Sequence, residues 1–309
     1  MFEKLVVVTR KTRLTELVER FNTRGQARFY IEHAGGDFAA YEREDDDQRR
    51  ALDALDASLR TLKLKVQVID RSFVPTFLFT EHDLIVTAGQ DGLVANTAKY
   101  VGAQPIVAVN PDPARIDGVL LPFTVQTASE AVRKVCVGRA RYREVTLAEA
   151  TLSDGQRLLA FNDLFVGART HVSSRYRIRT SEGHEEVQSS SGVIVSTGAG
   201  STGWLSSVFN MVDGIAASLT GREGVARPAF TWEDARLFFV VREPFVSRQS
   251  SAKVVAGAVA AGHELVIESL MPAGGAIFSD GIEEDFVAFN SGATARIRAA
   301  SQRARLVVG

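Results

Sequence analysis

The stretch SGVIVSTGAGSTGW, residues Ser191–Trp204, runs from an apolar segment into a loop of glycine, serine and threonine. A helix-like segment follows, from Trp204 to Val212. Small residues allow a ligand to approach the backbone closely, and the N–H groups at the start of a helix favour an anion. The stretch therefore predicts a strand, a loop and a helix that bind the phosphate or ribose of a nucleotide.

Two other interpretations of this loop stay open. Residues Gly198–Gly203 match G-x-G-x-x-G, the fingerprint of a Rossmann dinucleotide unit, and Glu223 lies about 20 residues further on, where such a unit carries its ribose-binding acid. Glycine and proline crowd the region around Glu223, however, and no clear second strand ends there. The stretch also fits a strand, turn and helix that bind no ligand. We favour a nucleotide loop of a different kind.

The composition limits the class of protein. A chain of 309 residues suits one large or two ordinary domains, and its net charge of −1 gives no argument for a nucleic acid or a membrane surface as partner. No apolar run approaches the roughly 18 residues of a membrane span. We therefore expect a cytoplasmic protein without nucleic acid or membrane partners.

Several kinds of site are excluded by what the sequence lacks. The single cysteine, Cys136, rules out an intramolecular disulfide and a cysteine-rich zinc site, and its valine neighbours predict a buried thiol. The five histidines show no metal-ligand spacing. There is no P-loop, no H-E-x-x-H and no G-x-S-x-G motif. We predict no metal site built by the protein alone.

Hydropathy patterns divide the chain into two parts. Before Phe123, strands alternate with helices, which predicts a parallel sheet with helices on its faces. After Phe123, one helix is followed by alternating segments such as Arg175–Arg179, which predict an antiparallel β-rich domain with one helix after the glycine loop. We place an α/β domain at residues 1–124 and a β-rich domain at 125–309, with a C-terminal tail that can return to the first.

Two surface features are predicted from charge and hydropathy. The stretch Tyr41–Arg50 is strongly charged, which predicts a solvated loop leading into a helix that Asp47 caps. No apolar surface helix of the kind that would hold a lipid is evident.

Two polar motifs outside the glycine loop are candidates for chemistry. Gly89-Gln90-Asp91-Gly92 follows a predicted parallel strand, where open α/β sheets bind ligands. Its glycines free the backbone to surround phosphates, and Asp91 can hold Mg²⁺ or accept a proton. Asn162 and Asp163 form a polar pair between apolar neighbours, and an amide beside a carboxylate can recognise a ribose or an adenine edge. Either motif can also be a plain turn.

Taken in order, these motifs resemble those of the NAD kinase family: G-G-D-G, an N-E/D pair and a loop of the form S-T-x-x-G-S-T-A-Y. The chain is most similar to the mitochondrial-type branch, within the superfamily that includes the diacylglycerol kinases. The resemblance covers roughly residues 65 to 290. It implies an N-terminal α/β domain and a C-terminal β domain, with the active site in the cleft between them.

The resemblance also implies residue roles and ligands. Asp91 is the implied catalytic carboxylate near the ribose 2′-hydroxyl of NAD, with ATP and Mg²⁺ as the donor and a homo-oligomer as the expected assembly. The implied nucleotide-binding residues are Gly89, Gln90, Gly92 and Leu93 on the ATP side, and Asn162, Asp163, Ser201, Thr202, Gly203 and Ser207 in the glycine-loop region and the NAD pocket.

Four residues depart from the family pattern. Gln90 stands in place of a glycine, Leu93 of a threonine, Trp204 of a tyrosine and Ser191 of an aspartate. We expect the Gln90 side chain either to point away from the ligand or to contact it directly. The departures leave open a kinase acting on another hydroxyl, such as a sugar, and a non-catalytic nucleotide sensor; an NAD-dependent oxidoreductase is a further alternative. ATP or polyphosphate as donor, and NAD or NADH as acceptor, also stay open.

Overall fold

The computed structural model describes residues 2–221, 224 and 226–309, so Glu223 lies outside the described residues. The chain forms two compact units: Met1–Arg143 with Arg305–Gly309, and Glu144–Ala304. Two strands, β6 (Arg141–Leu152) and β17 (Thr294–Val308), run from one unit to the other. This division falls later than the expected boundary at 124 and places the C-terminal residues in the first unit.

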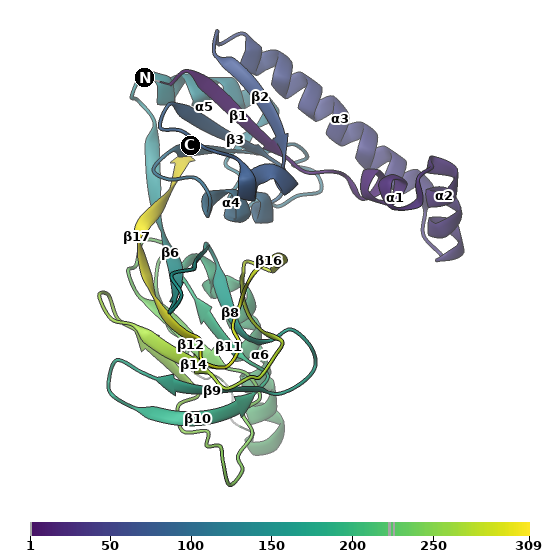
Figure 1. Ribbon diagram of the computed structural model, residues 1–309. Helices are drawn as coiled ribbons and strands as arrows, with labels where there is room; N and C mark the ends of the chain where they lie inside the picture. Colours follow the sequence, from purple (N-terminus) through teal and green to yellow (C-terminus); the bar gives the residue numbers. More distant parts are fainter. Residues whose placement is uncertain (1, 222–223, 225) are drawn as a thin grey trace. The chain divides into compact units, whose positions relative to one another are not determined.

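The first unit is built on a parallel sheet with the strand order β17-β4-β3-β1-β2, in which β5 also pairs with β4. Figure 1 shows the neighbouring strands β3, β1 and β2 of this sheet. The strands β1, β3 and β4 are largely buried apolar runs, as expected for a parallel sheet that helices cover, whereas the edge strand β2 is mostly exposed. The elements are β1 (Lys4–Thr9), α1 (Arg13–Phe21), α2 (Arg24–His33), α3 (Phe38–Arg60), β2 (Lys65–Asp70), the 3₁₀ helix η1 (Arg71–Thr76), β3 (Asp83–Ala88), α4 (Asp91–Ala98), β4 (Pro105–Asn110), β5 (Phe123–Thr124) and α5 (Val125–Cys136).

Helices α3 and α5 pack on this sheet. Leu55 and Leu59 of α3 and Val132 of α5 share one apolar core with the strand residues Val86 and Val107. The other end of α3 lies beside α1 and α2 (Figure 1), with its own small core.

The charged stretch Tyr41–Arg50 is helical, so its prediction as a loop was wrong. It lies inside α3, which Asp37 caps by accepting the Ala39 N–H. Asp45 is buried and accepts a hydrogen bond from Thr12, the residue that caps α1. Asp45 also pairs with Arg49, one helical turn further on. These partners compensate the charge that made the stretch resemble a solvated loop.

The second unit contains two sheets around one core. One is antiparallel with the order β13-β12-β11-β8-β15-β16, and the other has the order β10-β9-β14-β17, with β6 pairing β17 and β7. The elements are β7 (Arg157–Ala160), β8 (Asp163–Ala168), β9 (Ser174–Arg179), β10 (Glu185–Ser190), β11 (Val193–Ser196), η2 (Ala199–Thr202), α6 (Trp204–Thr220), β12 (Leu237–Val241), β13 (Ala256–Val259), β14 (Leu265–Ser269), β15 (Gly275–Ser279) and β16 (Ile282–Ala288). The predicted fold class, a parallel sheet with helices followed by an antiparallel β-rich part, is confirmed.

The strand before the glycine loop decides between the interpretations of that loop. β11 pairs antiparallel with both β8 and β12. A Rossmann unit needs a parallel βαβ crossover, in which the strand before the helix and the strand after it run in the same direction. The G-x-G-x-x-G match is therefore not a Rossmann fingerprint.

Helix α6 has an exposed apolar face, contrary to expectation. Met211, Val212, Ile215 and Leu219 are exposed, Leu219 by 79%. Leu205 is the buried residue of α6. The prediction missed this face because apolar residues at helical spacing normally mark a buried side. No helix in the described ranges combines the length and the apolar character needed to cross a membrane.

Cys136 is exposed, so the prediction of a buried thiol was wrong. It occupies the last position of α5, whose preceding residue, Val135, faces the core instead. Partial burial still raises the pKa of the Cys136 thiol.

We expect Asp45→Ala to lower the free energy of unfolding by about 1–3 kcal/mol, the cost of leaving buried donors without their acceptor. Thr12 and Thr15 both donate to Asp45 Oδ1. The matched control is Asp46→Ala, which removes an exposed carboxylate from the same turn of α3 and is expected to change stability by less than about 0.5 kcal/mol. Urea unfolding of both variants measures the difference, and equal effects would contradict the role assigned to Asp45.

Candidate functional site

Three neighbouring strands of the first unit, β1, β3 and β4, end at the same edge of the sheet because they are parallel. The residues that follow them line a pocket of about 410 Å³. Arg10 and Lys11 follow β1, Gly89 and Gln90 follow β3, and Pro111, Asp112, Arg115 and Ile116 follow β4. Open α/β sheets bind ligands at the carboxyl ends of their strands. The pocket is therefore a candidate ligand site.

The GQDG motif forms the turn between β3 and α4. Gly89 donates its N–H to the carbonyl oxygen of Val109 at 3.3 Å, and a Cβ on Gly89 would lie 2.8 Å from the Leu93 side chain. Leu93 is itself buried. Gly92, by contrast, is exposed in the first turn of α4 with open space around it. Gly89 and Leu93 therefore shape the turn, whereas Gln90 and Gly92 form its accessible surface.

The side chain of Gln90 contacts a residue that the sequence analysis did not single out. Arg10 Nη1 donates to Gln90 Oε1 at 2.9 Å. Gln90 precedes α4 but its side chain makes no capping hydrogen bond. The Gln90 side chain is thus engaged with a cation from the loop that follows the neighbouring strand β1.

Asp91 is the first residue of α4, and two backbone N–H groups hold its carboxylate. Oδ1 accepts from Leu120 at 2.9 Å and Oδ2 accepts from Val119 at 3.1 Å. These bonds tie the loop after β4 to the start of α4 and fix the orientation of the carboxylate. Each oxygen keeps a further lone pair for a proton or a ligand hydroxyl.

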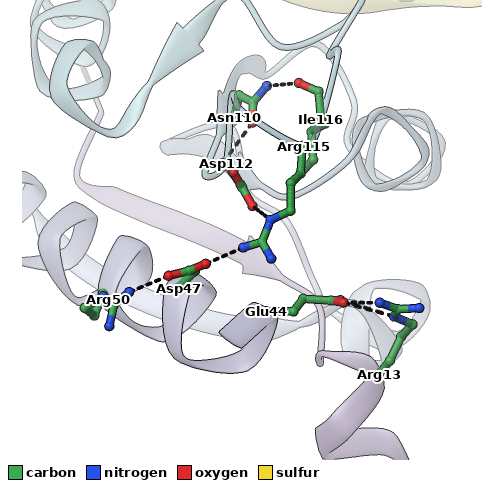
Figure 2. Close-up of polar contacts among 8 residues, drawn as sticks. All are labelled: Arg13, Glu44, Asp47, Arg50, Asn110, Asp112, Arg115 and Ile116. Carbon is green, nitrogen blue, oxygen red and sulfur yellow. Dashed lines mark hydrogen bonds and ion pairs between the residues drawn. The ribbon is translucent and has the colours of Figure 1, made fainter. Parts of the chain in front are cut away.

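Ion pairs join α3 to the loop after β4, as Figure 2 shows. Arg115 pairs with Asp112 of its own loop and with Asp47 of α3, where Nη2 and Oδ2 are 2.6 Å apart. Asn110 supports the same loop by donating Nδ2 to the Ile116 carbonyl at 2.8 Å. One wall of the pocket is therefore held by charged and amide side chains.

In the second unit, Asn162 lies in the turn between β7 and β8, and Asp163 is the first residue of β8. Asp280 holds this turn, because its carboxylate accepts the backbone N–H groups of Phe161, Asn162 and Asp163 at 2.9, 2.6 and 3.3 Å. The Asp280 N–H in turn donates to the Asp163 carbonyl at 3.0 Å. The sequence analysis did not assign Asp280 a role, since nothing in its local sequence indicates a partner so far away in the chain.

The glycine loop is bonded to this same turn. The Thr197 N–H donates to the Asn162 carbonyl at 2.9 Å. A Cβ on Gly200 would overlap that carbonyl, and a Cβ on Gly198 would overlap the backbone of Thr231. Both glycines are therefore required by close approach of backbone segments. Backbone packing therefore accounts for two of the glycines in this loop, Gly198 and Gly200, without any ligand.

The structure brings the predicted acceptor residues into one region. Ser201 is half-buried and donates its hydroxyl to the Gly198 carbonyl at 2.7 Å. Thr202, Gly203 and Ser207 are exposed where η2 leads into α6. The Gly203 N–H donates to the Gly200 carbonyl at 3.0 Å, and the Ser207 hydroxyl donates to the Gly203 carbonyl at 3.4 Å. The exposed hydroxyl oxygens of Thr202 and Ser207 can accept a hydrogen bond from a polar ligand.

Asp163 is 7% exposed. Burial, and secondarily the charge of Asp280, raise the pKa of Asp163 to about 7. A carboxyl group accepts hydrogen bonds when ionised and can donate one when protonated. The polar character of this turn is therefore expected to change near neutral pH.

A second pocket, of about 580 Å³, borders the start of α6 and was missed by the sequence analysis. Phe165 stacks on Trp204, with centroids 5.7 Å apart, and on Phe278, with centroids 4.8 Å apart. The Arg242 guanidinium lies 5.3 Å from the Trp204 ring. Aromatic faces with a cation beside them suit a planar, anionic ligand. These residues lie far apart in the sequence and form no motif.

No family model and no curated protein matches the sequence. Among solved structures, a yeast NADH kinase complexed with NADH aligns with 100% of this chain and 84% of its own, at a TM-score of 0.59 and 14% identity. An NAD kinase from Archaeoglobus fulgidus in complex with ATP aligns with 98% of this chain and 92% of its own, at a TM-score of 0.56 and 16% identity. The chain has the fold of the NAD kinases. Both units take part in this likeness.

We expect Gly200→Ala to destabilise the protein by about 2 kcal/mol or more, because the new methyl group would overlap the Asn162 carbonyl. Gly214→Ala is the matched control. Gly214 lies inside α6 with open space around it, so alanine is expected to stabilise the helix by about 0.5–1 kcal/mol. Thermal unfolding compares the two, and a stable Gly200→Ala variant would contradict the required close approach.

We also expect Asp163→Asn to become increasingly more stable than the wild type as the pH rises from about 4 to 7. The folded pKa of about 7 lies above the ordinary value of 3.8, so the folded state retains a proton that the unfolded state has released. The wild type therefore loses stability through this window, and the difference levels off above it. Asp154→Asn is the control, because backbone and side-chain bonds from Gln156 lower the pKa of Asp154. Urea titrations at several pH values that gave parallel curves would contradict the raised pKa.

Proposed function

We propose that the protein is an ATP-dependent NAD kinase of the mitochondrial type, which phosphorylates the adenosine ribose 2′-hydroxyl of NAD to give NADP. One observation carries the proposal: a chain with the NAD kinase fold presents the Asp91 turn, the Asn162–Asp163 turn and the glycine loop in the family order. Because the two solved kinases share only 14% and 16% identity with this chain, the order of these motifs is what supports the activity.

On the donor side, we assign the phosphates of MgATP to the pocket of the first unit. Gly89 and Gln90 of the phosphate turn line this pocket, and Gly92 is exposed in the same turn. The described part of the chain holds no group of three or more histidine, cysteine, aspartate or glutamate side chains that could hold a metal ion. Mg²⁺ is usually held by substrate phosphates and only one or two carboxylates, so we propose that it arrives with ATP.

On the acceptor side, we assign NAD to the second unit. The Asn162 amide and the Asp163 carboxyl would bind hydroxyl groups of the acceptor, and the exposed Thr202 and Ser207 would add further hydrogen bonds. The ring system of Trp204 offers a stacking surface for a planar base. The proposed acceptor site thus adds the aromatic ring of Trp204 to the residues predicted from the sequence.

The proposed chemistry uses Asp91 as the base. The 2′-hydroxyl oxygen attacks the terminal phosphorus of ATP, the bond to the bridging oxygen breaks, ADP leaves, and the hydroxyl proton passes to the Asp91 carboxylate. Phosphoryl transfer depends chiefly on positioning and on charge stabilisation. The two backbone N–H groups that hold Asp91 supply such positioning without any movement of the side chain.

The proposal is tested by incubating the purified protein with MgATP and, separately, NAD, NADH and common sugars, followed by mass spectrometry of the products. Phosphorylated NAD supports the proposal, and phosphorylated NADH identifies the reduced acceptor. A phosphorylated sugar would favour a same-fold kinase of another hydroxyl. No product with any acceptor, combined with measurable nucleotide binding, would favour a sensor. Cytoplasmic location and homo-oligomer formation stay predictions.

We expect Asp91→Asn to lower turnover by at least about a hundredfold, the lower range for loss of a positioned base. Asp117→Asn is the matched control, since Asp117 is an exposed carboxylate of the loop that Asp91 holds and is expected to leave turnover unchanged. Steady-state assays are combined with circular dichroism to verify folding. A folded Asp91→Asn variant with near wild-type turnover would remove Asp91 from the chemical step.

A further inference from the structure

The basic residues of the first unit's pocket differ in how their charges are balanced. Lys11 pairs with Glu19 at 2.8 Å, Arg13 with Glu44, and Arg115 with Asp112 and Asp47 (Figure 2). Arg10 pairs with no carboxylate among the described residues, and its guanidinium is bonded to the neutral Gln90 amide. Arg10 is therefore the cation of this pocket whose charge remains uncompensated.

The position of Arg10 follows from the sheet. β1 and β3 are adjacent and parallel, so the residue after β1 lies beside the turn after β3. The Arg10 side chain lies close to Gly89, since a Cβ on Gly89 would be in ordinary van der Waals contact with it, at 3.8 Å. The Arg10 carbonyl accepts a hydrogen bond from Gln48 of α3 at 2.6 Å, which fixes the backbone. Both ends of the residue are thus held.

Gln90 orients the guanidinium while keeping its charge available. Its amide oxygen engages one nitrogen of Arg10, and a guanidinium has five N–H donors in a planar fork. A glutamate at this position would instead neutralise the charge. Of the four basic side chains that line the pocket, Arg10, Lys11, Arg13 and Arg115, the last three have carboxylate partners. The charge that the pocket offers to an anionic ligand is therefore that of Arg10.

We propose that Arg10 binds a phosphate group of the phosphoryl donor, with Gln90 as its positioning residue, so that this pair recognises a polyphosphate chain. This proposal rests on the proposed kinase function for the identity of the donor, but not for the existence of the site. A polyphosphate chain can belong to a nucleoside triphosphate or to an inorganic polyphosphate. A guanidinium group can bind two phosphate oxygens at once, which requires a fixed orientation. A glycine at position 90 has no side chain that could orient the Arg10 guanidinium.

The test is calorimetric binding of MgATP and, separately, of inorganic tripolyphosphate with Mg²⁺. Arg10→Gln is expected to weaken binding by about 10- to 100-fold, as for loss of a hydrogen bond between charged groups. Gln90→Glu is expected to weaken it similarly, and its exposed position makes it safe for folding. Arg60→Gln, which removes an exposed arginine paired with Asp56 on α3, is the control and is expected to bind as the wild type.

The positioning role of Gln90 has its own readout. Gln90→Gly is expected to weaken binding in the wild-type background but to have no further effect when combined with Arg10→Gln. Additive losses would overturn the positioning role, because a merely structural effect does not depend on Arg10.

The two ligands separate the donor sources. Equal losses for MgATP and tripolyphosphate support recognition of the chain itself, whereas losses for MgATP alone support a nucleoside triphosphate as the source. Wild-type affinity of both Arg10→Gln and Gln90→Glu, or an equal loss in Arg60→Gln, overturns the proposal. Arg10-dependent tripolyphosphate binding by a protein that phosphorylates neither NAD nor NADH would reject the proposed function and leave this site standing.

Discussion

In a parallel sheet, the loops that follow the strands all begin at the same edge. This constraint decides where the polar residues of the first unit meet. Arg10 and Gln90 are eighty positions apart in the chain yet share a hydrogen bond, because the strands before them are hydrogen-bonded neighbours. The same edge carries Asp91 and the loop after β4, whose N–H groups hold the Asp91 carboxylate. The chemistry proposed for this unit depends on strand register more than on any local motif.

In the second unit, whose strands are antiparallel, the turns lie at both ends of the strands. Turns that form one site must therefore be joined by side-chain hydrogen bonds and close backbone contacts. Asp280 supplies three acceptor bonds to the Asn162–Asp163 turn, and Thr197 bonds the glycine loop to it. This tight packing buries Asp163 and raises its pKa. Rigidity and proton affinity at this turn thus have one physical origin.

The sequence predicted those features that depend on local pattern. The parallel sheet with helices before Phe123 and the antiparallel β-rich part after it follow from the hydropathy pattern. The helical state of Tyr41–Arg50 did not follow, because partners distant in sequence, such as Thr12, compensate its charges. The same limit explains why Asp280, Arg10 and the aromatic pocket at Trp204 were missed. Each acquires its role from contacts that no short stretch of sequence encodes.

The last strand also constrains how the chain can fold during synthesis. Leu306 of β17 pairs with Ile106 of β4, about 200 residues earlier. A ribosome therefore exposes that end of β4 long before its neighbour exists, and the strand edge stays open for the whole synthesis of the second unit. Open edges of apolar strands readily pair with other chains. Slow translation of the second unit would therefore prolong the time for which that end of β4 is open to pairing with another chain.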